Sequence, residues 1–313
     1  MLVAGVAGAF VAGAGIAAQS RVNGQLASEL GDGYVAALIS FASGLLIVAV
    51  VMLVAPSGRR GLVAVRAAVA EKRMPWWYLA GGAAGAFFVL SQGLTAALLG
   101  IAIFTVAIVL GQTLSGLVID RRGIGTTAPR AITVTRLVGS ALMLVAVVFV
   151  VSSRLQGGFP WWALLMPFAA GLGSGWQQAV NGQVRVASGS PIAATFINFV
   201  VGTSLLLVAA LVHAAGAGWP TQLPGNPVLY LGGIIGVIFI AVGTIVTPVI
   251  GVLLVGLATI AGQIVTSLLL DIFAPVTAQP IGWQVVVGTA LTLVAVGIAS
   301  LPSRRASGPG AGS

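Results

Sequence analysis

Apolar runs of about 20 residues constrain this chain more than any other feature. As a helix, such a run crosses about 30 Å, the hydrocarbon thickness of a bilayer. Helices are expected because an isolated span must satisfy its own backbone hydrogen bonds in lipid. With 58% hydrophobic and 6% charged residues, the composition excludes a soluble domain. The sequence thus predicts an all-α integral membrane protein. The ten predicted spans are 2–20, 34–54, 76–93, 97–118, 132–152, 161–178, 191–212, 228–246, 249–270 and 284–301.

One apolar stretch must hold two of these spans. Residues 76–119 would form a helix of about 66 Å, twice the length that a bilayer requires. The chain is therefore expected to fold back, with the turn at residues 91–93. Thr247 and Pro248 are expected to make the same turn in the matching later segment.

The chain also repeats itself. Residues 15–26, GIAAQSRVNGQL, return as residues 173–184, GSGWQQAVNGQV. Later glycines, glutamines and aspartates recur in the same order. Because amides and acids are scarce here, their recurrence indicates two homologous halves, residues 1–156 and 157–303, before a short cytoplasmic tail, 304–313, expected to be disordered. Five spans per half is an odd number, so we expect ten transmembrane helices as two inverted five-helix repeats.

The basic residues test this inversion independently. With the amino terminus in the cytoplasm, only Arg21 and Arg154 of the 14 basic residues fall outside, which is a strong positive-inside bias. Both termini are then cytoplasmic. Residues 61–73 alternate apolar and cationic side chains at helical spacing and are expected to form an interfacial helix. The net charge of +9 follows from this topology and from contact with anionic lipid, so no nucleic-acid partner is expected.

The inverted five-span repeat resembles the drug/metabolite transporter superfamily. The paired QxxxNGQ motif in the first span of each half, with the paired GQ and Asp of the fourth, is similar to YdcZ-type inner-membrane proteins in their fused two-copy form. The resemblance implies a helix bundle with a central cavity between the halves, alternating access and export, without naming a substrate. Small relatives in the superfamily carry an essential acid in the first span. This chain has none there, which argues against simple proton/drug antiport.

The repeated motif supplies the first candidate site. Gln19 and Asn23, like Gln177 and Asn181, are four residues apart, so each pair lies on one helix face. Two interpretations stay open, and they are compatible: Asn-Gly ends each helix through a left-handed cap, or the amides line a cavity and bind substrate. Trp176 lies beside the second pair, where it either stacks on a substrate or anchors the helix at the interface.

Further polar residues lie inside apolar spans. Gln112 and Gln263 are expected to face the bundle because an amide facing lipid is costly, and they bind either a neighbouring helix or cargo. Ser40 and Asn198 are expected to join helices. Asp271, flanked by apolar residues, is the proton-coupling candidate if it lies at membrane depth.

Other charged and small residues are assigned structural roles. Asp120, followed by two arginines, is expected to be a cytoplasmic rim charge. Glu29 and Asp32 are expected to be solvated in the first outer loop. The GxxxG pairs Gly81/Gly85 and Gly232/Gly236 are expected to let helices approach closely.

The sequence therefore favours a secondary transporter that moves a small metabolite or drug-like molecule through a cavity between the repeats. The alternatives are a non-transporting membrane scaffold or partner subunit, and a lipid translocator. No enzyme activity, cofactor or metal is expected, because the chain has one histidine, no cysteine and scattered acids. A functional monomer is expected since both halves lie in one chain, and a dimer stays open.

Overall fold

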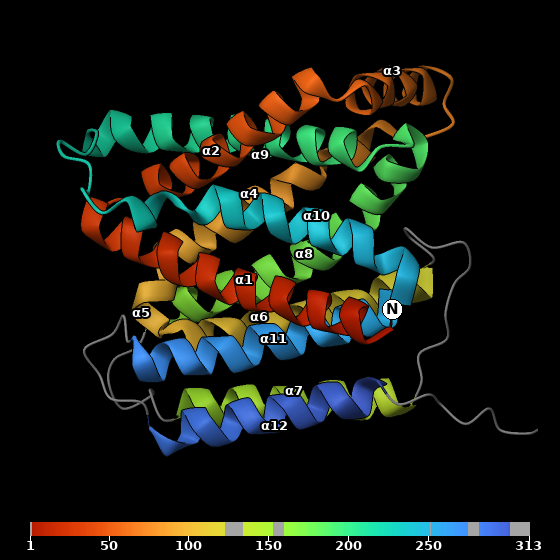
Figure 1. Cartoon of the computed structure of the whole chain (residues 1–313). Coiled ribbons are helices and arrows are strands. Elements are labelled where there is room, and N and C mark those ends of the chain that lie inside the picture. The colour runs from red at the N-terminus through yellow and green to blue at the C-terminus, as the bar shows by residue number, and fades with distance from the viewer. Residues whose placement is uncertain (1, 123–133, 153–159, 251, 275–281, 301–313) are drawn as a thin grey trace, which may run out of the picture.

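The chain is a bundle of long helices (Figure 1). The computed structural model describes residues 2–122, 134–152, 160–250, 252–274 and 282–300, and their regular elements are all helical. The first repeat contributes α1 (Leu2–Leu30), α2 (Gly33–Val54), α3 (Pro56–Ala70), η1 (Trp76–Ala80), α4 (Gly81–Ser91), η2 (Gln92–Ala96), α5 (Ala97–Leu99), α6 (Ile101–Arg122) and α7 (Val134–Ser152). The second contributes α8 (Trp161–Ser188), α9 (Pro191–Ala217), η4 (Pro227–Tyr230), α10 (Gly232–Ile250), α11 (Val252–Phe273) and α12 (Trp283–Ser300).

The helices have the length and composition of a multi-pass membrane protein. Among the described residues, five helices are long and apolar enough to cross a bilayer, and α7, α11 and α12 contain shorter apolar segments. The all-α membrane architecture expected from the sequence is confirmed. Residues 304–313, the predicted tail, lie outside the described residues.

Helices α1 and α8 both extend about three turns beyond their predicted ends. The Asn-Gly steps at Asn23 and Asn181 therefore lie inside helices, and the cap interpretation of these residues is wrong. Hydropathy falls at the polar motif, which suggested an end, but the amides bond to other helices and the helical backbone continues. The left-handed residues come later, at Gly31 (φ 68°) and Gly189 (φ 61°).

The fold-back between the third and fourth spans lies at Gly100, with φ 78° and ψ 154°. The turn predicted at residues 91–93 is wrong: α4 continues there into the π-helical turn η2. Gly93 approaches Gly33 so closely that a Cβ would lie 2.7 Å from the Gly33 carbonyl oxygen. The second predicted turn is also wrong, because α10 runs past Thr247 and Pro248 to Ile250.

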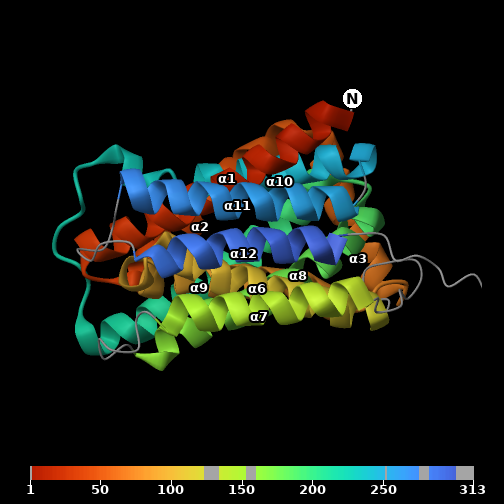
Figure 2. The same ribbon diagram turned by 90° about the horizontal axis from the view of Figure 1, so that it is seen from below.

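The two repeats interleave. Helix α1 packs mainly on α11 and α10 of the second half, while α8 packs mainly on α6 and α4 of the first. Helix α2 packs on α9, and α7 lies beside α12 in both views (Figures 1 and 2). Each of the long helices thus takes its main partner from the other repeat, so neither half buries its own apolar faces alone.

Repeat-equivalent glycines make these crossings possible. A Cβ on Gly13 of α1 would collide with the Thr259 carbonyl oxygen of α11, and a Cβ on Gly171 of α8 would collide with that of Ile108 in α6. The aromatic rings of Phe41 and Phe199 meet at 5.0 Å between centroids. Each ring also lies where a side chain on a glycine of the opposite helix would clash. Reciprocal contacts of this kind indicate a two-fold relation between the halves.

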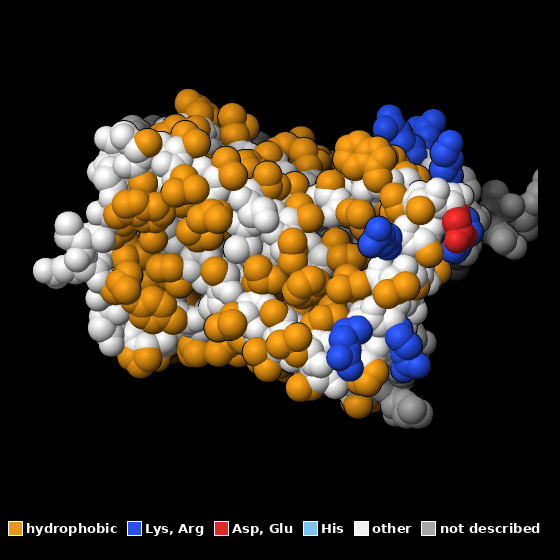
Figure 3. Space-filling view, turned by 90° about the horizontal axis from the view of Figure 1, so that it is seen from above, with side chains coloured by type: hydrophobic (Ala, Val, Ile, Leu, Met, Phe, Trp, Pro, Cys, Tyr) orange, Lys and Arg blue, Asp and Glu red, His pale blue; other side chains and the backbone are white. Residues whose placement is uncertain are grey.

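Helix α3 lies at the basic end of the bundle (Figures 1 and 3). It begins at Pro56, five residues before the predicted interfacial helix. Val65 and Ala68 are buried and belong to a core cluster with residues of α8 and α9. Arg59, Arg60 and Arg66 are exposed on the opposite side. On the face that Figure 3 shows, Lys and Arg gather at this end, and hydrophobic side chains are spread over the rest.

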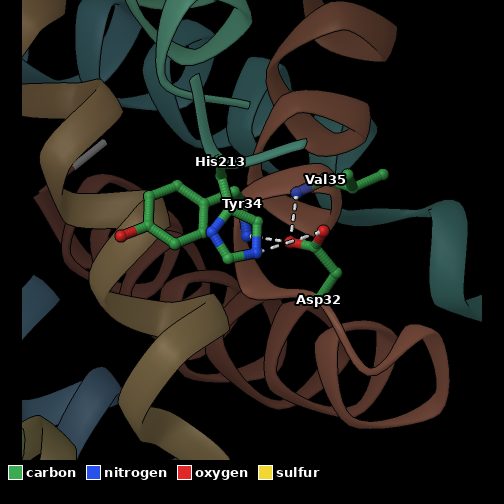
Figure 4. Close-up of polar contacts among 4 residues, drawn as sticks. All are labelled: Asp32, Tyr34, Val35 and His213. Carbon is green, nitrogen blue, oxygen red and sulfur yellow. Dashed lines mark hydrogen bonds and ion pairs between the residues drawn. The ribbon is translucent and has the colours of Figure 1, made fainter. Parts of the chain in front are cut away.

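The α1–α2 turn is fixed by Asp32 (Figure 4). Its Oδ1 accepts hydrogen bonds from the Tyr34 and Val35 N–H groups at 2.8 and 3.1 Å, which caps α2. His213 of α9 stacks on Tyr34 and places Nε2 3.7 Å from Asp32 Oδ2. Only 7% of Asp32 is exposed, so the expectation of a solvated carboxylate is wrong. The cap and the histidine together exclude water from it.

Candidate functional site

The repeated amides of α1 form a buried cluster. Gln19 donates from Nε2 to the Gly232 carbonyl oxygen of α10 at 2.8 Å. Asn23, fully buried, donates from Nδ2 to Gln92 Oε1 at 2.7 Å. The Gln92 amide in turn donates to the Ser20 hydroxyl at 2.9 Å. Together these hydrogen bonds join α1 to η2 of its own repeat and to α10 of the other repeat.

The amides of α8 form a second cluster with a different third member. Gln177 Nε2 and Asn181 Nδ2 both donate to Asn198 Oδ1 of α9, at 2.8 and 2.9 Å. This cluster is less buried than the α1 cluster, because Gln177 and Asn181 are half-buried whereas Gln19 and Asn23 are buried. Asn198 therefore joins helices, as its position predicted.

The clusters differ in where the third amide originates. In the first it is Gln92 of η2, and in the second it is Asn198 of α9. Sequence reasoning missed Gln92, because it treated residues 91–93 as a turn. The available signal was its rarity: an amide within an apolar run is costly unless another helix satisfies it.

Each amide pair is seated on the GxxxG pair of the opposite repeat. A Cβ on Gly236 would lie 2.8 Å from Gln19 Nε2, and one on Gly232 would collide with Asn23 Oδ1. In the inverted copy, a Cβ on Gly85 would lie 2.5 Å from Gln177 Nε2, and Gly81 meets Asn181 in the same way. The GxxxG glycines therefore allow helices to approach closely, as predicted, and the side chains that pack on them are the amides of the repeated motif.

Several buried polar atoms lack a partner among the described residues. Asn23 Oδ1 and Ser40 Oγ both lie close to Gly232 and have no hydrogen-bond partner there. The expectation that Ser40 joins helices through a hydrogen bond is therefore wrong for the described residues. Gln263 Oε1 is likewise unpartnered, although only 1% of the residue is exposed. Such atoms are expensive to bury, so a donor that reached them would be bound favourably.

Two remaining candidates, Gln112 and Trp176, do not join these clusters. Gln112 in α6 is half-buried, and Trp176 in α8 is half-buried directly before Gln177. Among the described residues, no hydrogen bond joins Gln112 or Trp176 to the amides. Among the described residues, no group of three or more His, Cys, Asp or Glu gathers as metal ligands would.

Asp271 near the end of α11 holds the start of α6. Its Oδ1 accepts from the Ile101 N–H at 2.8 Å, and its Oδ2 accepts from the Ala102 N–H at 2.7 Å. Both residues are fully buried, and they directly follow the break at Gly100. Arg21 of α1 interacts electrostatically with Asp271 and donates from Nε to the Ala274 carbonyl oxygen at 2.9 Å.

This geometry satisfies the free N–H groups of a helix start with a negative charge. Asp271 itself is buried, with 8% exposed. The side chain of its repeat equivalent, Asp120, lies outside the described residues.

The fold and the paired clusters define a multi-pass α-helical membrane protein built from two inverted, interleaved repeats. The chain belongs to the DMT_YdcZ family, described as "Putative inner membrane exporter, YdcZ", which matches residues 4–149 and 162–298 as two copies. One matched stretch falls in each predicted repeat. The family resemblance inferred from the motifs is confirmed, and the family supports a place in the membrane and a role in transport.

A solved structure, titled only "Crystal structure of protein", shares the fold. It is 17% identical to this chain, covers 94% of each chain and superposes with a TM-score of 0.56. No curated protein matches the sequence.

Proposed function

We propose that this protein is a secondary transporter, an exporter or facilitator, that moves a small metabolite or drug-like molecule across the cytoplasmic membrane by alternating access. One observation carries the proposal: α10 packs on α1 and α2, and α4 packs on α8 and α9, through repeat-equivalent contacts. Two equivalent interfaces related by inversion provide two closures, one toward each side of the membrane, that can open in turn.

In this proposal the amides bind the cargo when their interface opens. Gln19 then exchanges its bond to the opposite repeat for a bond to the substrate. Asn23, Gln177 and Asn181 exchange their bonds to Gln92 and Asn198 of their own repeats in the same way. Gln112, Gln263 and Trp176 contribute further contacts. The unpartnered acceptors on Asn23 and Gln263 favour a cargo that carries hydrogen-bond donors. Neutral amides suit an uncharged or zwitterionic molecule.

Asp271 is the proton-coupling candidate of this proposal. Both of its oxygens accept backbone hydrogen bonds at the α6 N-terminus, so uptake of a proton would weaken its hold on that helix start. The distribution of Lys and Arg favours cytoplasmic termini, and the presence of both repeats in one chain favours a functional monomer.

Metabolite profiling gives the substrate. Cells with the gene deleted and cells that overexpress it are compared for a compound whose inside-to-outside ratio moves in opposite directions. Flux of that compound is then measured with the purified protein in liposomes.

Engineered disulfides test the mechanism, since the native chain has no cysteine. A Cβ on Gly173 of α8 would lie 3.2 Å from the Ala84 Cβ of α4. The repeat-equivalent pair is Gly15 of α1 with Ile235 of α10, whose Cγ2 would lie 3.5 Å from a Gly15 Cβ. Both pairs are near the separation that a disulfide spans. We expect oxidation of either cysteine pair to stop the flux and reduction to restore it. Flux that continues through both cross-linked proteins would refute alternating access at these interfaces, and absence of any flux would favour the scaffold alternative.

A further inference from the structure

A hollow of about 310 Å³ lies at the basic end of the molecule, and neither amide cluster lines it. It is bounded by the end of α3, the linker to η1, η1 itself and the last turns of α8. Nothing in the proposed transport cycle uses this hollow, and the inference below does not depend on that proposal.

The floor of the hollow is apolar. Ala68 and Met74 are buried in a core cluster that also contains Val65 and Val184. Val186 lines the hollow as well and is 77% exposed on α8, so the apolar lining continues onto the outer surface of the bundle. A hydrocarbon chain can follow that surface out of the hollow into the bilayer.

The rim carries three hydrogen-bond donors: the Arg73 guanidinium, the Tyr78 hydroxyl and the Gln183 amide. Arg73 uses its Nε for Glu71 Oε2, at 2.6 Å, and its two terminal nitrogens have no partner among the described residues. No hydrogen bond of the Tyr78 hydroxyl or the Gln183 side chain is found in that part of the chain either.

Gln25, the repeat equivalent of Gln183, has hydrogen-bond partners for both its oxygen and its nitrogen. Gln25 in α1 accepts from Arg21 and donates to Glu29, both at 2.8 Å on its own helix. Gln183 has neither partner and instead faces the hollow. Its repetition in the QxxxNGQ motif is therefore not explained by the intrahelical bonding seen in the first half.

A strained turn positions Arg73 and Met74. Their N–H groups both donate to the Ala68 carbonyl oxygen, at 2.9 and 3.0 Å, after Lys72 adopts φ 58°. A left-handed lysine costs about 1–2 kcal/mol relative to a right-handed one, so tertiary contacts hold the turn in place.

The neighbouring aromatic residues indicate the depth of the hollow in the membrane. Trp76 and Trp77 are 71% and 38% exposed, and the Trp77 ring meets Tyr78 edge-on at 4.3 Å. Exposed Trp beside Tyr is typical of the head-group level of a bilayer. Arg66 and Lys72 are exposed nearby along the chain, which makes the surroundings positive.

We propose that this hollow is a binding site for an anionic phospholipid of the leaflet that faces the basic end of the protein. The lipid phosphate accepts hydrogen bonds from Arg73, Tyr78 and Gln183, and an acyl chain lies over Met74 and Val186. The two terminal nitrogens of Arg73, the Tyr78 hydroxyl and the Gln183 amide supply donors for a phosphate, while Glu71 occupies only the Arg73 Nε. The positive surroundings select against a head group that carries its own cation.

Lipid titration of the purified full-length protein in detergent tests the site, with bound lipid counted by native mass spectrometry. The probes are phosphatidylglycerol and phosphatidylcholine. We expect Arg73→Gln to weaken phosphatidylglycerol binding by about tenfold or more, as the loss of a charge-assisted hydrogen bond requires. The matched control, Arg60→Gln, removes the same charge from the exposed face of α3, does not line the hollow, and should leave binding unchanged.

Three results would overturn the proposal. Equal losses in the Arg73 and Arg60 variants would mean general attraction to surface charge. Equal binding of the two lipids would mean that the hollow does not select an anion. Displacement of phosphatidylglycerol by soluble glycerol phosphate would mean a site for a phosphorylated solute.

A second variant protects the test against misfolding. Tyr78→Phe keeps the ring and the net charge but removes one donor, and it should weaken phosphatidylglycerol binding alone. If Tyr78→Phe binds both lipids as the parent protein does, the hydroxyl is not part of a phosphate site and the proposal fails.

Discussion

Replacing Asp271 tests how strongly the second repeat holds the break in the first. In Asp271→Asn, one side-chain oxygen remains to accept from Ile101 or Ala102, and the charge that faces the helix start is lost. A hydrogen bond to a charged group contributes about 1.5–3 kcal/mol. We therefore expect the amide variant to lose about that free energy of unfolding.

Asp271→Ala removes both acceptors. Ile101 and Ala102 are fully buried, so water does not reach their N–H groups in the folded protein. Each unsatisfied buried donor costs about 1–3 kcal/mol, which gives a loss of about 2–6 kcal/mol for the pair. Arg21 also loses the charge with which it interacts. The alanine variant should thus be clearly less stable than the asparagine variant.

The matched control is Glu29→Gln, which makes the same acid-to-amide change at an exposed position of α1. Its effect should stay within about 0.5 kcal/mol. Unfolding of the purified proteins in one detergent, followed as loss of the monodisperse fraction with temperature, ranks the variants. We expect the order of stability to be parent, Glu29→Gln, Asp271→Asn, then Asp271→Ala. If both Asp271 variants unfold at the same temperature as the Glu29→Gln control, the carboxylate does not stabilise the start of α6 and the reasoning is wrong.

Three further substitutions test the packing and the turns. Gly232→Ala places a Cβ against Asn23 Oδ1 and should abolish or strongly reduce the amount of folded protein in a detergent-solubilised expression assay. Its control is Gly182→Ala, where a Cβ would have nothing within 4 Å, and this variant should gain up to about 1 kcal/mol in free energy of unfolding. Lys72→Gly should exceed Lys72→Ala in thermal stability by about 1 kcal/mol, because both remove the charge and only glycine relieves the left-handed backbone. Asp32→Ala should cost about 0.5–2 kcal/mol through loss of the α2 cap, with Asp32→Ser retaining most of it, as denaturation of each variant in the same detergent would show. Equal stability of the two variants within any of these pairs would contradict the close contact, the backbone strain or the helix cap that the pair tests.

The clusters of the candidate site were only partly predictable. Gln19, Asn23, Gln177 and Asn181 were recognisable because rare side chains recur at helical spacing in both repeats. Their partners were not, since Gln19 bonds to Gly232, 213 residues away. Gln92 was mistaken for part of a turn, because local composition treats an amide as an interruption whether or not another helix satisfies it.

Helix boundaries failed for the same reason. Hydropathy measures the cost of moving each residue out of water, one local window at a time. The polar motif in α1 is costly to move out of water. The hydrogen bonds that its amides make to α10 and η2 offset this cost, so the helix continues to Leu30. Glycine conformation was equally invisible locally: Gly100 makes the fold-back, while Gly93 is used for close approach to Gly33.

From the sequence alone, an all-α membrane protein with two inverted repeats of the DMT_YdcZ type could be predicted. Bilayer thickness sets the length of each apolar run, and an odd number of spans forces the second copy to be inverted. Which helix faces meet became visible only in the tertiary structure. The amide stripe of each repeat lies on the glycines of the other, and Asp271 caps a helix 170 residues earlier in the chain. Those pairings depend on the shapes and unsatisfied polar groups of surfaces that exist only after both halves have interleaved.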